Sequence, residues 1–271
     1  MTSSTGAPRA ILDDPPPPAD VRLAYGDEPS QFGDLYLPAD SGDGRAPLVI
    51  LLHGGYWRAR YGLDYLGHVA AALADDGIAA WNLEYRRVGE QGGGWPGTFE
   101  DVRAGVAFGR ALHRDHPVDV SRVVLVGHSA GGHLALWSVA DLDATPHGRD
   151  GLSVVALAPV ADLGEAWTRR LSDNAVAGLL GGGPDAFPNR YDTACPTRRL
   201  PLGVPTCVVH GMADTSVPFD MAKAYVTRAR EAGDDVALVA LENTDHFEPV
   251  DPETAAYGVV RRVVHDLAEL T

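Results

Sequence analysis

The sequence predicts a mostly parallel, doubly wound α/β sheet that is covered by helices on both faces. The chain has 271 residues, of which 45% are hydrophobic, and this is enough to bury one substantial core. Six short and nearly continuous apolar runs are typical of strands that are covered on both faces. Segments with helical spacing separate these runs, so strands and helices alternate along the chain.

The predicted elements follow in order. At residues 21–38, the segments VRLAYG and FGDLYLP predict two short strands joined by a turn, as at an antiparallel edge. The six apolar runs are 48–52, 78–83, 123–126, 154–158, 206–209 and 236–241. Helical spacing links two sets of residues: Phe99, Val102, Val106 and Gly109, and then Tyr257, Val260, Val264 and Leu267. Asp251 can cap the last helix and Pro252 can open it.

Two segments depart from this alternation. Residues 1–20 contain two aspartates followed by four prolines, which lack an N–H and fix φ, so we expect a flexible N-terminal arm. Residues 21–271 then form a single domain. Within it, residues 160–203 contain the run GGGP, three further prolines and scattered aromatics, which predicts a small lid or cap over the site.

The charge of the chain argues against several classes of partner. The formal net charge is −15 at pH 7, whereas nucleic acids and anionic membranes attract basic patches. The first residues lack the basic and apolar regions of a signal peptide, and no apolar stretch reaches the ~18 residues that a membrane span needs. We therefore expect a cytoplasmic protein with neither a nucleic-acid nor a membrane partner, and leave a homodimer open.

The sequence predicts no metal site and no cofactor. Cys195 and Cys207 lie too far apart for a CxxC pair, and we expect them to be reduced thiols. There is no HExxH motif, and His128 and His133 are five residues apart, which misses the i, i+4 spacing of a zinc-binding helix. We therefore expect these two histidines to be packing or rim residues.

The clearest catalytic motif is GHSAG at 127–131. An apolar run enters it and helical spacing resumes at Leu134, so the order is strand, G-x-S-x-G turn and helix. Such a turn presents its serine at the carboxyl end of the strand, near helix N-terminal amides that favour developing negative charge. We therefore predict Ser129 as the nucleophile, and the alternative is an ordinary glycine-rich turn.

A second glycine turn, HGGYW at 53–57, follows the first apolar run. Turns of this type supply a backbone N–H for an oxyanion, and the residue after the nucleophile supplies a second. We predict an oxyanion hole formed by Gly54, Gly55, Tyr56 and Ala130, and leave open whether Gly55 or Tyr56 donates. The alternative is a simple turn at a strand end.

The base and the acid are expected on loops after later strands. A serine hydroxyl needs a neutral imidazole to accept its proton, and a carboxylate fixes the tautomer of that imidazole. Asp214 follows the fifth apolar run and His246 follows the sixth. We predict His246 as the general base and Asp214 as the acid that orients it, with Asp162, which follows the fourth run, as the main competitor.

With these residues assembled, the chain resembles the α/β-hydrolase superfamily from about residue 21 to its end. HGGYW at 53–57, GHSAGGHL at 127–134 and DHFEPVD at 245–251 look like the kynurenine formamidase (arylformamidase) branch, close to the hormone-sensitive-lipase and carboxylesterase group. The resemblance implies an α/β-hydrolase fold and hydrolysis of N-formylkynurenine to kynurenine and formate, a step of tryptophan breakdown, through an acyl-enzyme without metal. It carries over Ser129, Asp214 and His246 as the triad. HGGYW replaces the HGGG form of the lipase group, which favours the formamidase, although esterases with the same turn exist.

Three functions therefore stay open, and two of them use a small-molecule ester or amide as substrate. The first is an aryl formamidase, the second a carboxylesterase for short acyl or aryl esters, and the third a noncatalytic binding protein with the same fold. For either enzyme we expect the substrate pocket to include Trp57, His128, Trp167, Phe219 and Phe247, although aromatic residues more often belong to the core.

Overall fold

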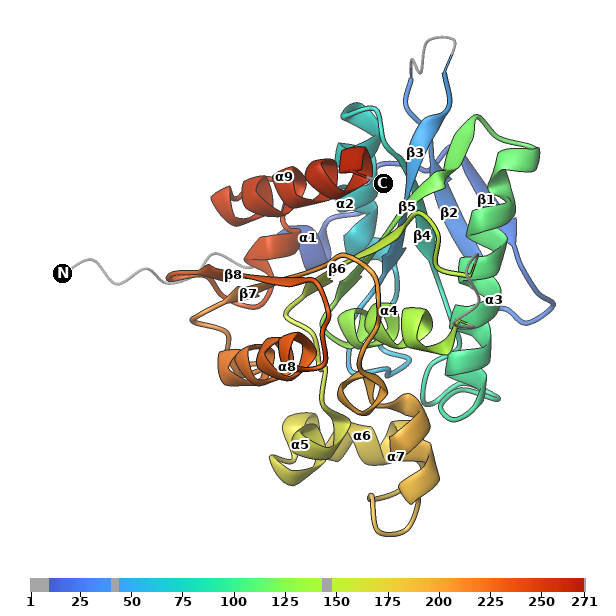
Figure 1. Ribbon diagram of the computed structural model, residues 1–271. Coiled ribbons are helices and arrows are strands. Elements are labelled where there is room, and N and C mark those ends of the chain that lie inside the picture. Colours follow the sequence, from blue (N-terminus) through green and yellow to red (C-terminus); the bar gives the residue numbers. More distant parts are fainter. Residues whose placement is uncertain (1–9, 40–43, 143–147, 271) are drawn as a thin grey trace.

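A computed structural model describes residues 10–39, 44–142 and 148–270. Within these ranges, eight strands form one sheet in the order β1-β2-β4-β3-β5-β6-β7-β8 (Figure 1). The strands are β1 Val21–Ala24, β2 Phe32–Tyr36, β3 Ala46–Leu52, β4 Ala79–Leu83, β5 Val118–His128, β6 Leu152–Leu157, β7 Thr206–Gly211 and β8 Val236–Leu241. The pairs from β4 through β8 are parallel, whereas β2 pairs antiparallel with both β1 and β4. The predicted fold class and its antiparallel edge are confirmed.

Helices cover both faces of this sheet, as Figure 1 shows. One face packs against α1 Ala10–Asp13, α2 Asp64–Asp75 and α9 Ala255–Leu270, and the other against α3 Gly97–Ala111, α4 Ala130–Asp141 and α8 Phe219–Glu231. Short 3₁₀ turns add η1 Leu112–Arg114, η2 Pro196–Arg199 and η3 Glu248–Val250. No helix in the described ranges combines the length and the apolar character that crossing a lipid bilayer requires.

The central strand β3 shows why its apolar run is continuous. Leu48, Ile50 and Leu52 belong to the core on the α3 and α4 side, whereas Val49 and Leu51 belong to the core on the α2 and α9 side. Successive side chains of a strand point to opposite faces, so a strand covered on both sides needs apolar residues at every position.

The expectation of a flexible arm does not hold for residues 10–20. Ile11 is 5% exposed in the core beside α2, and the Tyr36 hydroxyl donates to the Pro17 carbonyl at 3.0 Å. The His68 ring bonds the Asp14 carbonyl at 3.1 Å. Proline lacks a donor but keeps its carbonyl acceptor and an apolar ring, so this segment is held without joining the sheet. Residues 1–9 lie outside the described ranges.

The predicted insertion at 160–203 consists mainly of short helices. They are α5 Leu163–Thr168, α6 Leu171–Leu180 and α7 Pro188–Ala194, followed by η2. Their buried residues, such as Val176, Leu179 and Tyr191, join the core on the α4 side. Figure 1 shows the three helices together beyond α4 and α8.

The start of α9 differs from the prediction. Thr254 Oγ1 accepts the N–H of Tyr257 at 3.1 Å, which gives one free amide of the first turn a partner. Asp251 instead accepts the N–H of Glu253 at 3.1 Å, within the preceding turn. The helix therefore begins three residues later than Pro252 suggested.

Candidate active site

Ser129 lies at the sharp turn between β5 and α4, at the carboxyl end of its strand. Its φ of 57° and ψ of −117° form a conformation that residues with side chains rarely adopt, at a cost of roughly 1–3 kcal/mol. Neighbouring glycines make the turn possible, because a Cβ on Gly127 would collide with the Gly131 carbonyl and a Cβ on Gly131 would collide with the Leu52 carbonyl. The motif therefore forms the strained strand-to-helix turn that the sequence predicts.

Asp214 and His246 meet at the carboxyl ends of two neighbouring strands. Asp214 follows β7 and His246 follows β8, and these strands are parallel neighbours. The His246 Nδ1–H donates to Asp214 Oδ2 at 2.6 Å, and both side chains are buried. This bond leaves Nε2 as the ring nitrogen that can accept a proton.

Other donors hold the Asp214 carboxylate in its ionised form. Asp214 Oδ1 accepts the backbone N–H groups of Ser216 and Val217 at 2.7 and 2.9 Å. His210 Nε2 lies 3.2 Å from Oδ2 and also donates to the Val217 carbonyl at 2.9 Å. Burial alone would raise the pKa of Asp214, but the hydrogen bonds from His210, His246 and the backbone outweigh it and lower this pKa well below its usual value. The Nδ1 side of the His246 ring therefore faces an ionised carboxylate.

Ser129 and His246 line one cavity of about 120 Å³. Its walls are mostly apolar and aromatic side chains, and its lining residues are Leu12, Gly55, Tyr56, Tyr61, Tyr65, His128, Ser129, Ser216, His246 and Phe247. Among the described contacts, no hydrogen bond joins the Ser129 hydroxyl to the His246 ring. Such bonds are often long without a substrate and tighten when one binds.

The loop after β3 contributes two residues that line this cavity and whose amides have no described partner. The Gly54 N–H donates to the Tyr65 hydroxyl at 2.6 Å and is thereby occupied. Gly55 and Tyr56 have positive φ values of 104° and 50°, and no described hydrogen bond uses their N–H groups. Ala130 is the first residue of α4, so its N–H has no partner within the helix. Of the four predicted oxyanion residues, Gly54 therefore has another use, and the other three keep available amides.

His53 anchors this loop from below. Its Nε2 bonds Glu84 Oε1 at 2.8 Å, and its ring stacks on Tyr85 at 4.3 Å between centroids. Burial would raise the pKa of Glu84, but His53 and Arg87 lower it overall, so the carboxylate stays charged. Glu84 is one of the residues that the sequence analysis missed, because its position beside His53 comes from the pairing of β3 with β4.

Two of the five predicted pocket residues, His128 and Phe247, line the cavity, and the other three do not. Trp57 is fully buried and packs edge-on against the His133 ring. Trp167 belongs to α5, where a Cβ on Gly183 would touch its ring, and Phe219 packs edge-on against His210. These three aromatic side chains fill the core or support neighbouring elements.

The insertion at 160–203 contributes no residue to this cavity. It contacts the loop after β3 through Ser172, whose hydroxyl accepts from Arg58 Nη1 at 3.2 Å and whose carbonyl accepts from Arg58 Nη2. The N-terminal segment supplies a wall instead, through Leu12, which is 42% exposed. The expectation of a lid at 160–203 is therefore not met by the described residues.

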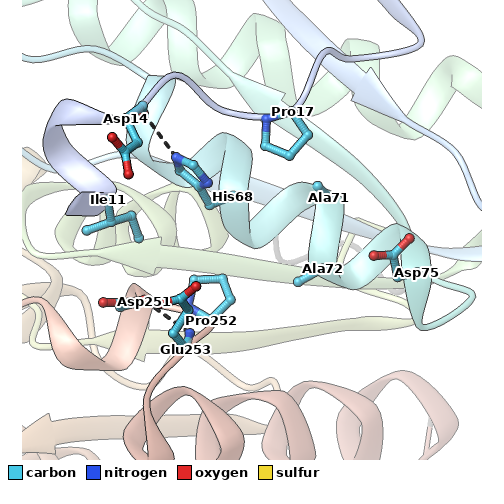
Figure 2. A pocket seen from close by; sticks show the side chains of 10 residues that line it. All are labelled: Ile11, Asp14, Pro17, His68, Ala71, Ala72, Asp75, Asp251, Pro252 and Glu253. Carbon is cyan, nitrogen blue, oxygen red and sulfur yellow. Dashed lines mark hydrogen bonds between the residues drawn. The ribbon is translucent and has the colours of Figure 1, made fainter.

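A larger hollow of about 310 Å³ lies on the other side of α1 (Figure 2). Its rim carries four carboxylates, from Asp14, Asp75, Asp251 and Glu253. Ile11 lines this hollow while Leu12 lines the cavity at Ser129, so α1 separates the two. Neither Ser129 nor His246 reaches the acidic hollow, so its size does not make it the catalytic centre.

Within the part of the chain that the structure describes, no three His, Cys, Asp or Glu side chains are grouped so that they could hold a metal ion. Cys195 and Cys207 are both buried and free. Burial raises the pKa of the Cys207 thiol to about 11, so it stays protonated.

Two buried histidines beside the site predict acid sensitivity. Burial lowers the pKa of His128 to about 3 and that of His133 to about 4, from 6.5. The unfolded chain therefore binds more protons than the folded chain as the pH falls below about 6.5. We expect the free energy of unfolding to fall by up to about 1.4 kcal/mol per histidine for each pH unit down to the folded pKa. Urea unfolding at pH 7.5 and pH 5 measures this change.

His133→Gln isolates one of these contributions. His133 Nε2 donates to the Ala194 carbonyl at 2.9 Å, and a glutamine can keep a donor there without titrating. We expect the variant to lose less stability than the wild type between the two pH values. His116→Gln, at a half-buried position, serves as the control. If the free energy of unfolding of His133→Gln depended on pH as strongly as that of the wild type, His133 would not contribute to the acid sensitivity.

Comparison with known proteins places this site in a family context. A family model described as BD-FAE matches residues 33–228, more than half of the chain. Esterase LipC from Mycobacterium tuberculosis is 28% identical over 228 residues, which cover 77% of this chain and 54% of LipC. Kynurenine formamidase from Danio rerio is 23% identical over 233 residues, which cover 84% of this chain and 75% of that protein. The chain spans about half the length of the first curated relatives it matches.

Solved structures agree on the fold. Esterase B from Lactobacillus rhamnosis superimposes with a TM-score of 0.76 and 22% identity over 96% of this chain and 90% of that one. Together with the family model, this likeness confirms the predicted resemblance to the α/β-hydrolase superfamily.

Proposed function

The chain belongs to the BD-FAE family, and from this membership we propose that it is a serine hydrolase that cleaves carboxylic esters with short acyl groups. One observation carries the proposal: Ser129 and His246 line the same small cavity, while Asp214 holds the far side of the His246 ring at 2.6 Å. Gly55 and Tyr56, whose N–H groups have no described partner, line this cavity, and Ala130, whose N–H is free at the start of α4, directly follows Ser129.

In the first half of the proposed reaction, Ser129 Oγ attacks the acyl carbonyl and His246 Nε2 takes its proton. The negative charge on the carbonyl oxygen is stabilised by the Ala130 N–H and by the N–H of Gly55 or Tyr56. The Asp214 carboxylate stabilises the imidazolium that forms. As the bond to the alcohol breaks, His246 returns the proton to the leaving oxygen, and the acyl group stays on Ser129.

In the second half, a water molecule replaces the alcohol. His246 Nε2 takes a proton from the water as its oxygen attacks the acyl carbonyl, and the same amides stabilise the second oxyanion. The bond to Ser129 then breaks, and the proton returns to Oγ. The acid product leaves and the free enzyme is restored.

The size of the cavity supports a short acyl group. Its volume of about 120 Å³ is well below the ~300–1,000 Å³ of a typical ligand pocket. The walls are apolar and aromatic, from Leu12, Tyr61, Tyr65 and Phe247. Esterase relatives such as LipC agree with an ester as the substrate.

A formamide of an aromatic amine is the second candidate. A formyl group is the smallest acyl group, and the aromatic walls suit an aryl leaving group. The likeness to kynurenine formamidase from Danio rerio favours this choice. Both reactions use the same acyl transfer, so substrate preference alone separates them.

Steady-state kinetics tests the two candidates. The substrates are p-nitrophenyl acetate, butyrate and octanoate beside N-formylkynurenine, each with the wild type and with Ser129→Ala. We expect kcat/KM to be highest for acetate or butyrate and to fall at octanoate. Higher kcat/KM for N-formylkynurenine would select the formamidase, and hydrolysis that survives in Ser129→Ala would contradict both candidates.

Leu12→Ala tests the wall that α1 contributes. Leu12 lies at the cavity but touches no group of the proposed reaction, so its loss removes binding and leaves the chemical step unchanged. Removing about half of a leucine's burial costs about 1 kcal/mol, so we expect KM for the butyrate ester to rise about fivefold with kcat unchanged.

Leu37→Ala is the matched control, since Leu37 is half-buried and does not line the cavity. An unchanged KM in Leu12→Ala, or an equal rise in Leu37→Ala, would remove α1 from the substrate site.

A further inference from the structure

Three hydrogen bonds link the loop after β3 to the proposed base, and the mechanism above does not use them. The Gly54 N–H donates to the Tyr65 hydroxyl at 2.6 Å, and the Tyr65 hydroxyl bonds His128 Nδ1 at 2.9 Å. His128 Nε2 then bonds the carbonyl oxygen of His246 at 2.9 Å. All of these groups are buried.

Only one placement of hydrogens satisfies this chain. A backbone N–H can only donate, so the Tyr65 oxygen accepts from Gly54 and gives its own hydrogen to His128 Nδ1. A carbonyl can only accept, so His128 carries its proton on Nε2 and donates to His246. Burial and the nearby His246 lower the pKa of His128 to about 3, which preserves this neutral tautomer at the pH of an assay.

These three hydrogen bonds hold backbone groups on both sides of Ser129, at the base and at the oxyanion loop. His128 directly precedes Ser129 and holds the backbone of His246, so it relates the base to the nucleophile. Tyr65 ties down Gly54, and the next two amides, of Gly55 and Tyr56, are those left free for an oxyanion. A displacement of about 1 Å at such groups can cost about 100-fold in rate.

We propose that Tyr65 and His128 are positioning residues. Through these three hydrogen bonds they keep the oxyanion loop, the turn that carries Ser129 and the base His246 in fixed positions relative to one another. The inference rests on the proposed function. His128 is thus more than the packing or pocket residue that the sequence suggests. Tyr65, the second residue of α2, carries no motif of its own and was not predicted.

Packing alone is the competing explanation. The Tyr65 ring lies edge-on to the His128 ring at 5.7 Å between centroids and to the Phe247 ring at 6.2 Å. Tyr65→Phe keeps these ring contacts and removes only the hydroxyl. The variant therefore separates the chain from the packing.

The experiment measures kcat and KM on the preferred ester for Tyr65→Phe, with the folded fraction matched by circular dichroism. Without the hydroxyl, the oxyanion loop and the base are no longer held in fixed relative positions. We therefore expect kcat to fall about 10- to 100-fold while KM stays within about threefold. A kcat within twofold of the wild type would overturn the proposal, even if the melting temperature fell.

Variants at His128 extend the test. Glutamine can still donate to the His246 carbonyl, whereas leucine cannot. We expect His128→Gln to keep at least tenfold more kcat than His128→Leu. Both variants remove the bond between Tyr65 and His128, so the losses of kcat in Tyr65→Phe and His128→Leu should combine to less than their product in the double variant. Equal losses for Gln and Leu, or losses that multiply fully in the double variant, would overturn the proposal.

Nitrogen NMR of His128 distinguishes this inference from the proposed function, because it needs no substrate. The wild type should show the Nε2–H tautomer, and Tyr65→Phe should shift the Nδ1 resonance as its donor is lost. An Nδ1–H tautomer in the wild type would overturn the chain whatever the enzyme hydrolyses. If the wild type hydrolyses no ester while the predicted tautomer is present, the proposed function is wrong but the arrangement of the three hydrogen bonds is supported.

Discussion

Ser129→Ala is expected to lower kcat by a factor on the order of 10⁶ and to leave the fold intact. Without Oγ no acyl-enzyme forms, and the amides and the cavity provide only the residual rate that remains when a nucleophile is lost. The Ser129 backbone donates to the Leu157 carbonyl and accepts from the N–H groups of His133 and Val160, and alanine keeps all three bonds. Steady-state hydrolysis of p-nitrophenyl butyrate measures the loss.

The same variant has a structural control. Ser138 Oγ donates to the Ala135 carbonyl inside α4, so Ser138→Ala removes a buried serine hydroxyl from the adjacent helix. We expect Ser138→Ala to stay within about threefold of the wild-type kcat, as for a residue outside the reaction. A Ser129→Ala enzyme that keeps more than 1% of the wild-type rate would contradict the assignment of the nucleophile.

Asp214→Asn is expected to lower kcat by a factor on the order of 10⁴. Asp214 Oδ1 accepts two backbone N–H groups, from Ser216 and Val217, so an asparagine keeps its oxygen there and turns its NH₂ toward His246. His246 Nδ1 must then accept, which moves the ring proton to Nε2 and leaves no acceptor for the Ser129 proton. The measurement is kcat for the same ester at pH 7.5.

Asp162→Asn is the matched control for this carboxylate. Asp162 caps α5 by accepting the Glu165 N–H at 3.0 Å and pairs with Arg228 at 2.7 Å. It does not line the cavity, so its amide variant should keep kcat within about twofold. A large loss from Asp162→Asn together with a harmless Asp214→Asn would reverse the choice of acid.

The sequence predicts the fold and the meeting of Asp214 with His246 well, because both depend on local order. Each of the six apolar runs lies in a strand, apart from a residue at some ends. Asp214 and His246 follow neighbouring parallel strands, so predicting the two strands is enough to bring the side chains together at one edge. The sharp turn at Ser129 is likewise predictable, because the glycines that make it possible lie within the motif itself.

What the sequence does not predict depends on contacts between distant segments. Leu12 reaches the cavity because Ile11 and the proline segment pack on α2, which proline content alone does not indicate. Trp167 and Phe219 are aromatic, and Phe219 follows Asp214 closely in sequence, but both side chains pack elsewhere. Tyr65 belongs to a helix with ordinary amphipathic spacing, so its hydroxyl has no signature in the chain.

Covalent labelling of Ser129 tests the central claim most directly. A p-nitrophenyl alkylphosphonate mimics the ester and leaves a stable adduct on an activated serine, which peptide mass spectrometry can locate. We expect one adduct per chain, on the peptide that contains Ser129, with slower labelling in Asp214→Asn and none in Ser129→Ala. A wild-type chain that stays unlabelled, or carries its adduct on another residue, would contradict the account.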